Sequence, residues 1–397
     1  MSSGSGSPRK APGASRQRRR DRFRINHQDT KSTKRLSSAV TIIGGGPAGA
    51  VAAVLLARCG WDVTVVEQQR FPRDKVCGEC VSALGIDVLT RHRLEQKVQA
   101  LSPVSLRRGA MVAPSGEQIR FDLPQSMWGV SRSAMDAVLL DAGRDAGARL
   151  LQPARAERVR DGGVSVRCLA TNRVIDLRAR HVILADGKGA LAGERPRLTG
   201  DFGLKAHFSD VADRTDTISL FGLAGHYVGA APIENGRWNV AMSVPASRLN
   251  SFRGRLDELF EQLMREKVGL ARRFVRARRV SDWLVAPLPR FAVRRHCPPN
   301  VIPIGNAAAA LEPIGGEGIG LALRSAELAA TALIEGRPLE SLPRAFDGLW
   351  QLRRGTCRLV AQLLSRPTIA DAVIPFACAN EAIGQLIMSC MGKRGDS

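Results

Sequence analysis

The chain has 397 residues, of which 44% are hydrophobic and 24% charged, and its net charge is +22. This composition is typical of a soluble globular protein with mass for about two or three domains. No apolar run approaches the roughly eighteen residues of a membrane span, and the N-terminus lacks the apolar core of a secretory signal, so we expect a cytoplasmic protein. The eight cysteines do not have the spacing of a disulfide framework, so we predict that their thiols are reduced.

Residues 1–38 form a basic tail that is poor in large apolar side chains. The first 36 residues hold eleven Lys or Arg against two Asp, and this surplus of nine leaves +13 in the rest of the chain. Such a segment cannot bury enough surface to offset its ordering entropy, so we predict a disordered tail. It has no interleaved aromatic residues and no nucleic-acid motif follows it, so no nucleic acid is expected. The basic body favours an acidic carrier protein or an anionic membrane surface, with peripheral membrane association as the alternative location.

The clearest structural pattern of the chain lies between Ala39 and Glu67, where the sequence reads AVTIIGGGPAGAVAAVLLARCGWDVTVVE. Its β-branched start predicts a strand, which a glycine turn, a helix and a second strand follow. Gly44, Gly46 and Gly49 make G-x-G-x-x-G, in which the glycines permit a tight turn, close approach of a pyrophosphate and close packing of helix on strand. Glu67 ends the second strand, where its carboxylate can accept hydrogen bonds from a ribose. The stretch therefore predicts a dinucleotide site.

Residues 71–80 read FPRDKVCGEC and include the C-x-x-C pair Cys77 and Cys80. Structural zinc is disfavoured because it takes four ligands and no second pair follows. A redox dithiol normally accompanies a thioredoxin-like unit, whereas this pair follows a nucleotide-binding pattern. We therefore interpret this segment as a loop with cysteines that lack a covalent partner.

The next segments alternate between strands and one helix. A hairpin is expected within about 100–128, and Ser131 is a plausible N-cap for a helix over 131–147. Three strands over 155–184 look like a meander. The last of them ends at Asp186 and Gly187, which suit a second close approach to a cofactor at the carboxyl edge of a sheet.

From about 201 the pattern changes to mixed β-prone segments. These segments and an arginine-rich helix over 252–275 predict a separate substrate domain with an antiparallel sheet, and the arginines are expected to form a solvated face or a docking surface. A strand over 301–304 then precedes GNAAAALEPIGGEGIG at 305–320 and a helix to about 335. These glycines are too dense for a helix interior, and at the helix start backbone N–H groups could face an anionic ring or phosphate.

With these three motifs in this order, the chain resembles the FAD-dependent oxidoreductases of the geranylgeranyl reductase family, within the wider group that includes p-hydroxybenzoate hydroxylase. The resemblance covers roughly residues 40–335 and implies FAD as the cofactor, with NADPH as a candidate external reductant. G-E-G-I at 316–319 matches the reductase branch better than the G-Q-G-x-N of the hydroxylase branch. The W-x-W-x-I-P motif of flavin-dependent halogenases is absent.

The resemblance also implies roles for particular residues. It places Cys77 over the isoalloxazine ring as the candidate catalytic residue, and Arg132 near the cofactor. Asn306 stands where the family usually has an Asp that binds the ribityl chain; the amide still accepts from a hydroxyl but removes a charge close to the flavin. No metal is expected. The cofactor-binding residues expected are Gly44, Gly46, Ala48, Gly49, Glu67, Arg132, Asp186, Gly187, Gly305, Asn306, Gly316, Gly318 and Ile319.

The fold class expected is α/β, with a Rossmann-like FAD-binding domain, an inserted antiparallel-sheet substrate domain and a helical C-terminus. The expected boundaries are 1–38 for the tail, 39–200 and 290–338 for the FAD-binding domain with a β insertion at about 100–128, 201–289 for the substrate domain, and 339–397 for the C-terminal helices, which we expect to pack on the body.

The function that the resemblance implies is reduction of carbon–carbon double bonds in a small hydrophobic substrate, isoprenoid or polyketide-like. In this hypothesis reduced FAD delivers a hydride and an acid protonates the other carbon. One alternative is a flavin-dependent monooxygenase that hydroxylates a small organic substrate. Another is a flavin-binding or carrier-docking protein without turnover, which Asn306 and the basic surface keep open. No motif in 201–289 identifies the substrate.

Overall fold

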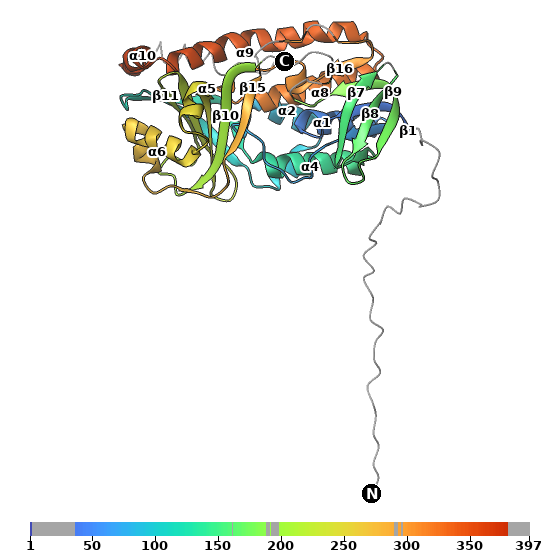
Figure 1. Ribbon diagram of the computed structural model, residues 1–397, viewed down its shortest axis with the longest axis horizontal. Helices are drawn as coiled ribbons and strands as arrows, with labels where there is room; N and C mark the ends of the chain where they lie inside the picture. The colour runs from blue at the N-terminus through green and yellow to red at the C-terminus, as the bar shows by residue number, and fades with distance from the viewer. Residues whose placement is uncertain are drawn as a thin grey trace. The chain divides into compact units, whose positions relative to one another are not determined.

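The computed structural model describes residues 1, 36–160, 162–187, 191, 198–289, 293–294 and 297–379. The chain from residue 35 onward forms one compact unit (Figure 1). The described part of this unit is built around two sheets, and helices pack on both of them. Nearly all of the tail that we predict to be disordered lies outside the described residues, as do residues 380–397. The predicted domain boundaries stay a prediction.

The first sheet brings the predicted cofactor motifs to one edge. Its strand order is β6-β2-β1-β9-β8-β7, and β16 also pairs with β9. Ile43 of β1 aligns with Val66 of β2 and with Leu184 of β9, and all three strands are parallel. The residues that follow these strands therefore meet at the carboxyl edge of the sheet, where open α/β sheets bind ligands. The strands are β1 (Leu36–Ile43), β2 (Val63–Val66), β6 (Arg149–Leu151), β7 (Ala154–Arg160), β8 (Gly163–Cys168), β9 (Val174–Leu184) and β16 (Val301–Pro303).

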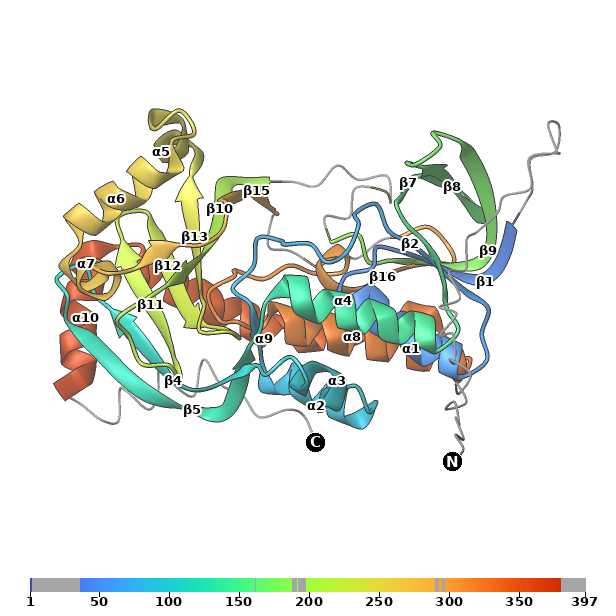
Figure 2. The same cartoon turned by 90° about the horizontal axis from the view of Figure 1, so that it is seen from below.

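Helices cover one face of this sheet and the β7–β8 meander covers the other. α1 (Pro47–Arg58) contacts both α4 (Arg132–Asp145) and α8 (Gly318–Ile334), and the three run side by side in Figure 2. Val40 and Ile42 of β1 pack toward these helices, whereas Ile43 packs with the meander, so side chains alternate as expected for a strand buried on both faces. The short helices α2 (Ala83–Arg91) and α3 (Glu95–Gln99) follow the Cys77 loop.

The second sheet is mostly antiparallel and contains the predicted hairpin. Its order is β14-β10-β13-β12-β11-β4-β5-β3, with β15 paired to β10. The hairpin β4–β5 joins through a parallel pairing of β4 with β11, so strands far apart in sequence share one sheet. The strands are β3 (Cys80–Val81), β4 (Val104–Val112), β5 (Gln118–Gly129), β10 (Leu198–Ser209), β11 (Thr217–Leu223), β12 (His226–Pro232), β13 (Trp238–Pro245), β14 (Arg278–Arg279) and β15 (Leu284–Pro289).

The expected helix over 252–275 is wrong, because this region forms separate helices. They are α6 (Leu256–Glu266) and α7 (Val268–Phe274), which pack on one face of the second sheet, and the short α5 (Ala246–Ser251) precedes them. The chain breaks at Arg253 and Gly254, whose φ angles are +50° and +80°, and again at the extended Lys267. Arg273 does not lie on a solvated face: it is 9% exposed, and its Nε lies 2.8 Å from Asp213 Oδ2.

The helix α9 (Leu342–Leu364) links the two sheets. Its first half, with Phe346 and Trp350, packs into the core of the first sheet, and its second half packs with Leu220 and Tyr227 of the second sheet, next to α10 (Pro367–Ala379). The expectation that apolar stripes beyond residue 339 pack on the body therefore holds for these two helices. No helix among the described residues is long and apolar enough to cross a bilayer.

Two leucines of α9 provide a test of this packing. Leu364 is fully buried, whereas Leu359 is 62% exposed. Leu364→Ala should lower the free energy of unfolding by about 2–5 kcal/mol because it removes apolar contacts and leaves a cavity. Leu359→Ala should change it by about 0.5 kcal/mol or less. Urea unfolding of both variants measures the difference, and equal losses would contradict the packing of α9 on the second sheet.

Candidate active site

The glycine turn after β1 is shaped by close backbone contacts. A Cβ at Gly44, where φ is +104°, would lie 2.4 Å from the Ala185 carbonyl oxygen, and a Cβ at Gly49 would lie 1.9 Å from the Gly44 carbonyl oxygen. Both positions therefore require glycine so that β1, β9 and α1 can approach. Gly46 differs, since a Cβ there would meet only guanidinium atoms at 3.7 and 3.8 Å. It faces a space bordered by positive charge.

That positive charge comes from three side chains and exceeds the nearby negative charge. Arg132, at the start of α4, forms two 2.7 Å hydrogen bonds to Asp136, and Arg73 Nη1 lies 3.1 Å from the same carboxylate. Lys75 lies beside them and lines the same cavity as Gly46. Asp136 thus pairs with both arginines, and its charge also acts on Lys75. Because buried charges need partners, this cluster fits an anion such as the pyrophosphate of a dinucleotide.

The pKa values in this cluster reflect its surplus of positive charge. Burial, and then the charges of Arg132 and Arg73, lower the pKa of Lys75 to about 8. Burial is also the largest influence on Arg73, whose pKa is lowered. For Arg132, burial opposes the charged form, but the charge and hydrogen bonds of Asp136 outweigh it and raise the pKa. An incoming anion would relieve the electrostatic cost at Lys75 most directly.

Glu67 lies at the end of β2 and holds the glycine turn. Its Oε2 accepts a 2.7 Å hydrogen bond from the Gly45 N–H, and its Oε1 accepts one of the same length from the Gln69 N–H. Each oxygen of a carboxylate has further acceptor capacity, so the predicted hydrogen bond to a ribose is compatible with these contacts.

Ten of the fourteen residues that the sequence predicts for the site line one cavity of about 210 Å³. Of the other four, Gly44, Glu67 and Asp186 follow the ends of strands β1, β2 and β9, and Gly49 lies in the first turn of α1. The cavity extends from the cationic cluster to the second sheet. Individual contacts to a cofactor stay predictions. The ten residues are Gly46, Ala48, Cys77, Arg132, Gly187, Gly305, Asn306, Gly316, Gly318 and Ile319.

The turn before α8 contains both expected and unexpected features. Gly305 has a φ of +57° and its N–H donates to Ser325 Oγ at 2.8 Å, which leaves the exposed Asn306 side chain at the cavity. A Cβ at Gly316 would lie 2.8 Å from Met127 Cε, and one at Gly320 would lie 2.2 Å from Ser82 Oγ. These two glycines therefore permit packing against neighbouring elements. A Cβ at Gly318 would meet nothing within 4 Å, so only this glycine faces open space.

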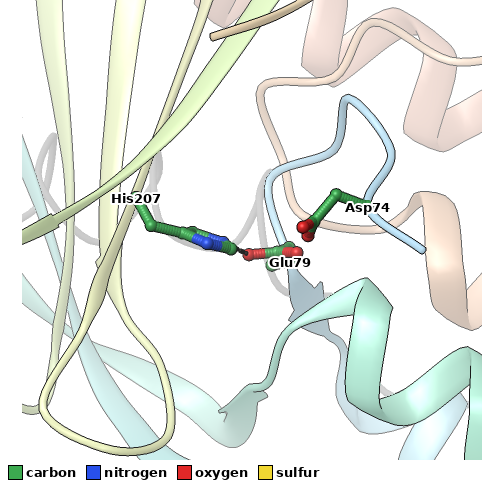
Figure 3. Close-up of side chains that lie close together, drawn as sticks. All are labelled: Asp74, Glu79 and His207. Carbon is green, nitrogen blue, oxygen red and sulfur yellow. Dashed lines mark hydrogen bonds and ion pairs between the residues drawn. The ribbon is translucent and has the colours of Figure 1, made fainter. Parts of the chain in front are cut away.

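The Cys77 loop is fixed to the second sheet by a buried carboxylate. Glu79 is fully buried with a φ of +57°, and its Oε1 accepts from the Arg132 N–H at 2.7 Å and from Lys205 Nζ at 2.5 Å. Its Oε2 lies 2.7 Å from His207 Nε2 (Figure 3). Asn239 Nδ2 donates to the Cys77 carbonyl at 3.1 Å. Strand β10 therefore holds the Cys77 loop at Glu79, and strand β13 holds it at Cys77.

Asp74, Glu79 and His207 converge closely enough to suggest a metal site, and Figure 3 shows Asp74 and His207 on opposite sides of Glu79. However, Lys205 Nζ also lies 3.2 Å from Asp74 Oδ1, so its ammonium already bridges both carboxylates. A metal would have to displace this charge. We therefore interpret the cluster as a charge network that positions the Cys77 loop.

Both loop cysteines are free. Cys80 is buried, which raises the pKa of its thiol, and its Sγ donates to the Gly78 carbonyl at 3.3 Å. Cys77 is half-buried in the cavity wall, its Sγ accepts from the Glu79 N–H at 3.4 Å, and it also hydrogen-bonds to Arg132. The two thiols therefore have different environments, and Cys77 faces the cationic cluster.

A second cavity, of about 90 Å³, adjoins the first. Gly78, Cys80, Pro313 and Gly316 line both. Its floor is one face of the second sheet, where small side chains at alternate positions leave room, and Tyr227 lies at its border with the first cavity. The small floor residues include Gly229, Ala231 and Ala241.

Sequence reasoning missed several of these residues. Arg73 and Lys75 lie in the loop already singled out for its cysteines, where the density of charge in FPRDK was a usable signal. Lys205, His207 and Tyr227 left no comparable signal, because they are single polar residues in apolar strands. Only the pairing of distant strands brings them to the site.

The two-sheet α/β fold, the glycine turn and the cationic cavity define an FAD-dependent oxidoreductase. Residues 37–337 match the family described as FAD binding domain, and the chain belongs to this family. The chain is 28% identical over 379 residues to a menaquinone reductase of Mycobacterium tuberculosis, covering 89% of this chain and 91% of that one. It is 27% identical over 374 residues to digeranylgeranylglycerophospholipid reductase 1 of Methanopyrus kandleri, covering 88% and 96%.

The solved structure of the flavin-dependent brominase Bmp2 has a TM-score of 0.74 at 18% identity, over 90% of this chain and 93% of that one, and shows the shared fold. The expected α/β class, FAD and the resemblance to the geranylgeranyl reductase family are confirmed.

The pH dependence of FAD affinity tests the cationic cluster. Below pH 8, Lys75 is protonated whether or not FAD is bound, so the affinity for FAD should not change with pH. Above pH 8, Lys75 of the free protein has lost its proton and must take one up when FAD binds. The affinity for FAD should therefore fall by up to about tenfold per pH unit above pH 8. Lys75→Met should bind more weakly with little pH dependence, and Lys75→Arg should bind tightly at all pH values. Fluorescence titration between pH 7 and about 9.5 measures this. An unchanged alkaline decline in Lys75→Arg would contradict the assignment.

Proposed function

We propose that this protein uses FAD to reduce carbon–carbon double bonds of a hydrophobic isoprenoid substrate. The observation that supports this best is the apolar second cavity, which shares four lining residues with the cavity that fits FAD. The two relatives, matched over nearly the whole chain, are named as reductases of menaquinone and of a digeranylgeranyl phospholipid.

The lining of the second cavity suits a slender apolar chain. It includes no Asp, Glu, Lys or Arg among the described residues, and its polar side chains are Tyr227 and Asn239, with the thiol of Cys80. Apolar surface taken from water provides the binding energy for such a chain, about 25 cal/mol per Å². The glycines and alanines on the sheet face leave a hollow that bulkier residues would fill.

Roles for the site residues follow from their positions. FAD supplies hydride chemistry when bound. The cationic cluster of Arg73, Lys75 and Arg132 would hold its pyrophosphate, and the N-terminus of α8 at Gly318 would direct a partial positive charge at the ring. Cys77 would face the ring at the entrance to the substrate cavity, fixed by the Glu79 network. NADPH stays the candidate electron donor.

In this proposal the first sheet with α1, α4 and α8 is the FAD-binding domain, and 201–289 with the β4–β5 hairpin is the substrate domain. An anionic partner would suit the exposed face of α9, where Arg344, Arg354 and Arg358 lie. An anionic membrane surface and an acidic carrier protein are both compatible with this charge.

Anaerobic reoxidation tests the reaction class. Protein with reduced FAD is mixed with vesicles of digeranylgeranylglycerophospholipid, or with its fully saturated counterpart as the matched control. Recovery of flavin absorbance only with the unsaturated lipid, together with a saturated product, would support the proposal. No recovery with either lipid would contradict an isoprenoid lipid substrate.

Cys77 provides a second test. Cys77→Ala should retain FAD and slow reduction of the unsaturated lipid by roughly 10–100-fold, since a positioned acid or contact at the ring is lost. The control is Cys59→Ala, because Cys59 is an exposed free cysteine. Product formation under single-turnover conditions measures both variants. If Cys77→Ala is as fast as the unchanged protein, Cys77 has no catalytic role.

A further inference from the structure

The buried Tyr227 and the half-buried Glu312 form a hydrogen-bonded pair that joins the linings of the two cavities. Tyr227 Oη donates to Glu312 Oε1 at 2.8 Å. Glu312 lines the larger cavity and Tyr227 lines the apolar one, and Pro313, which follows Glu312, lines both. Tyr227 is only 5% exposed. A phenol hydroxyl thus lies beside the space for an apolar substrate, with a carboxyl group behind it that reaches the cofactor cavity.

The surroundings raise the pKa of both groups. Burial, then the charge of Glu312 and the hydrogen bond to it, raise the pKa of Tyr227 well above its usual range. Burial also raises the pKa of Glu312, and the charge of Asp201 adds to this, whereas Tyr227 and Arg358 lower it. Cys357 and Asp201 also contribute to the rise at Tyr227. The phenol therefore stays neutral where free tyrosine ionises, and the Glu312 carboxyl group keeps its proton to a higher pH than an ordinary glutamate, so a proton that leaves the phenol can be replaced from Glu312.

We propose that the Tyr227 hydroxyl donates the proton that completes reduction of a double bond held in the apolar cavity, and that Glu312 orients this hydroxyl and restores its proton. This inference rests on the proposed reductase function and names the proton donor for it. Tyr227 would be the catalytic residue because it faces the substrate, and Glu312 would be a positioning residue that acts through it.

The step balances with the cofactor as the reductant. The π bond of the substrate breaks, one carbon gains a hydride with the two electrons of the reduced cofactor, and the other carbon gains the Tyr227 proton. For this step Glu312 must be protonated and donate to Tyr227 Oη, the reverse of the hydrogen bond in the structure, which frees the phenol hydrogen for the substrate. The carboxyl proton moves to Oη as the phenol proton leaves, so no phenolate accumulates, and solvent then reprotonates Glu312.

Tyr227 is the only tyrosine of the chain, so its ionisation can be followed without turnover. Protein labelled with tyrosine carrying ¹³C at Cζ should give one NMR signal that does not titrate where free tyrosine does, near pH 10. Glu312→Gln removes the neighbouring negative charge and should lower the titration midpoint. An unchanged midpoint in this variant would show that Glu312 does not control Tyr227, and would overturn the pair.

Single-turnover reduction of digeranylgeranylglycerophospholipid then tests the chemical role. Tyr227→Phe keeps the ring and should slow product formation by about 100-fold or more, with loss of the solvent isotope effect and unchanged FAD affinity. Glu312→Gln should also slow it and should move the decline in rate at alkaline pH to a lower pH, together with the titration midpoint of Tyr227. Ser219→Ala is the control, since it removes a buried hydroxyl from the neighbouring strand β11 whose partner is Asp213.

The outcomes separate the two proposals. If the unchanged protein reduces the lipid and Tyr227→Phe does so equally fast, the proton-donor inference is overturned and the reductase function stands. If the unchanged protein reduces neither this lipid nor a short-chain menaquinone, both fall. A slow Tyr227→Phe variant that keeps the isotope effect and alkaline decline would assign Tyr227 to substrate binding and also overturn the inference.

Discussion

The buried carboxylate of Glu79 is the contact on which the arrangement of the site depends. It accepts hydrogen bonds from the first N–H of α4 and from Lys205 of β10, and it lies within hydrogen-bond distance of His207 on the same strand. One side chain therefore joins the Cys77 loop, a helix on the first sheet and a strand of the second. Leaving a group of this kind without its partners would cost several kcal/mol, on the order of 3–5. The two cavities can share a wall only while these elements stay in register.

The charges around the glycine turn set the second constraint. Arg73 and Arg132 share the carboxylate of Asp136 and Lys75 lies close to both arginines, so an anion in the cavity would complement their charge. Asn306, which also lines this cavity, adds no negative charge to it.

Local patterns predicted the parts of the fold that local physics determines. The glycine turn, the strands around it and the Ser131 cap of α4, whose hydroxyl accepts from the Ala134 N–H at 3.3 Å, could all be read from short stretches. The helix over 252–275 could not, because left-handed Arg253 and extended Lys267 interrupt an apolar period that looks continuous. The Glu79 network joins residues more than 120 positions apart, and only strand pairing reveals it.

The fate of molecular oxygen tests the central claim most directly, because the same fold also serves monooxygenases. The purified protein with FAD and NADPH is given a short-chain menaquinone or geranylgeraniol under ¹⁸O₂, and the product mass is measured. This account predicts a product heavier by two hydrogen atoms per reduced double bond, with no ¹⁸O, and equal yield without oxygen. Incorporation of ¹⁸O into a product that forms only in the presence of oxygen would contradict it and identify a monooxygenase.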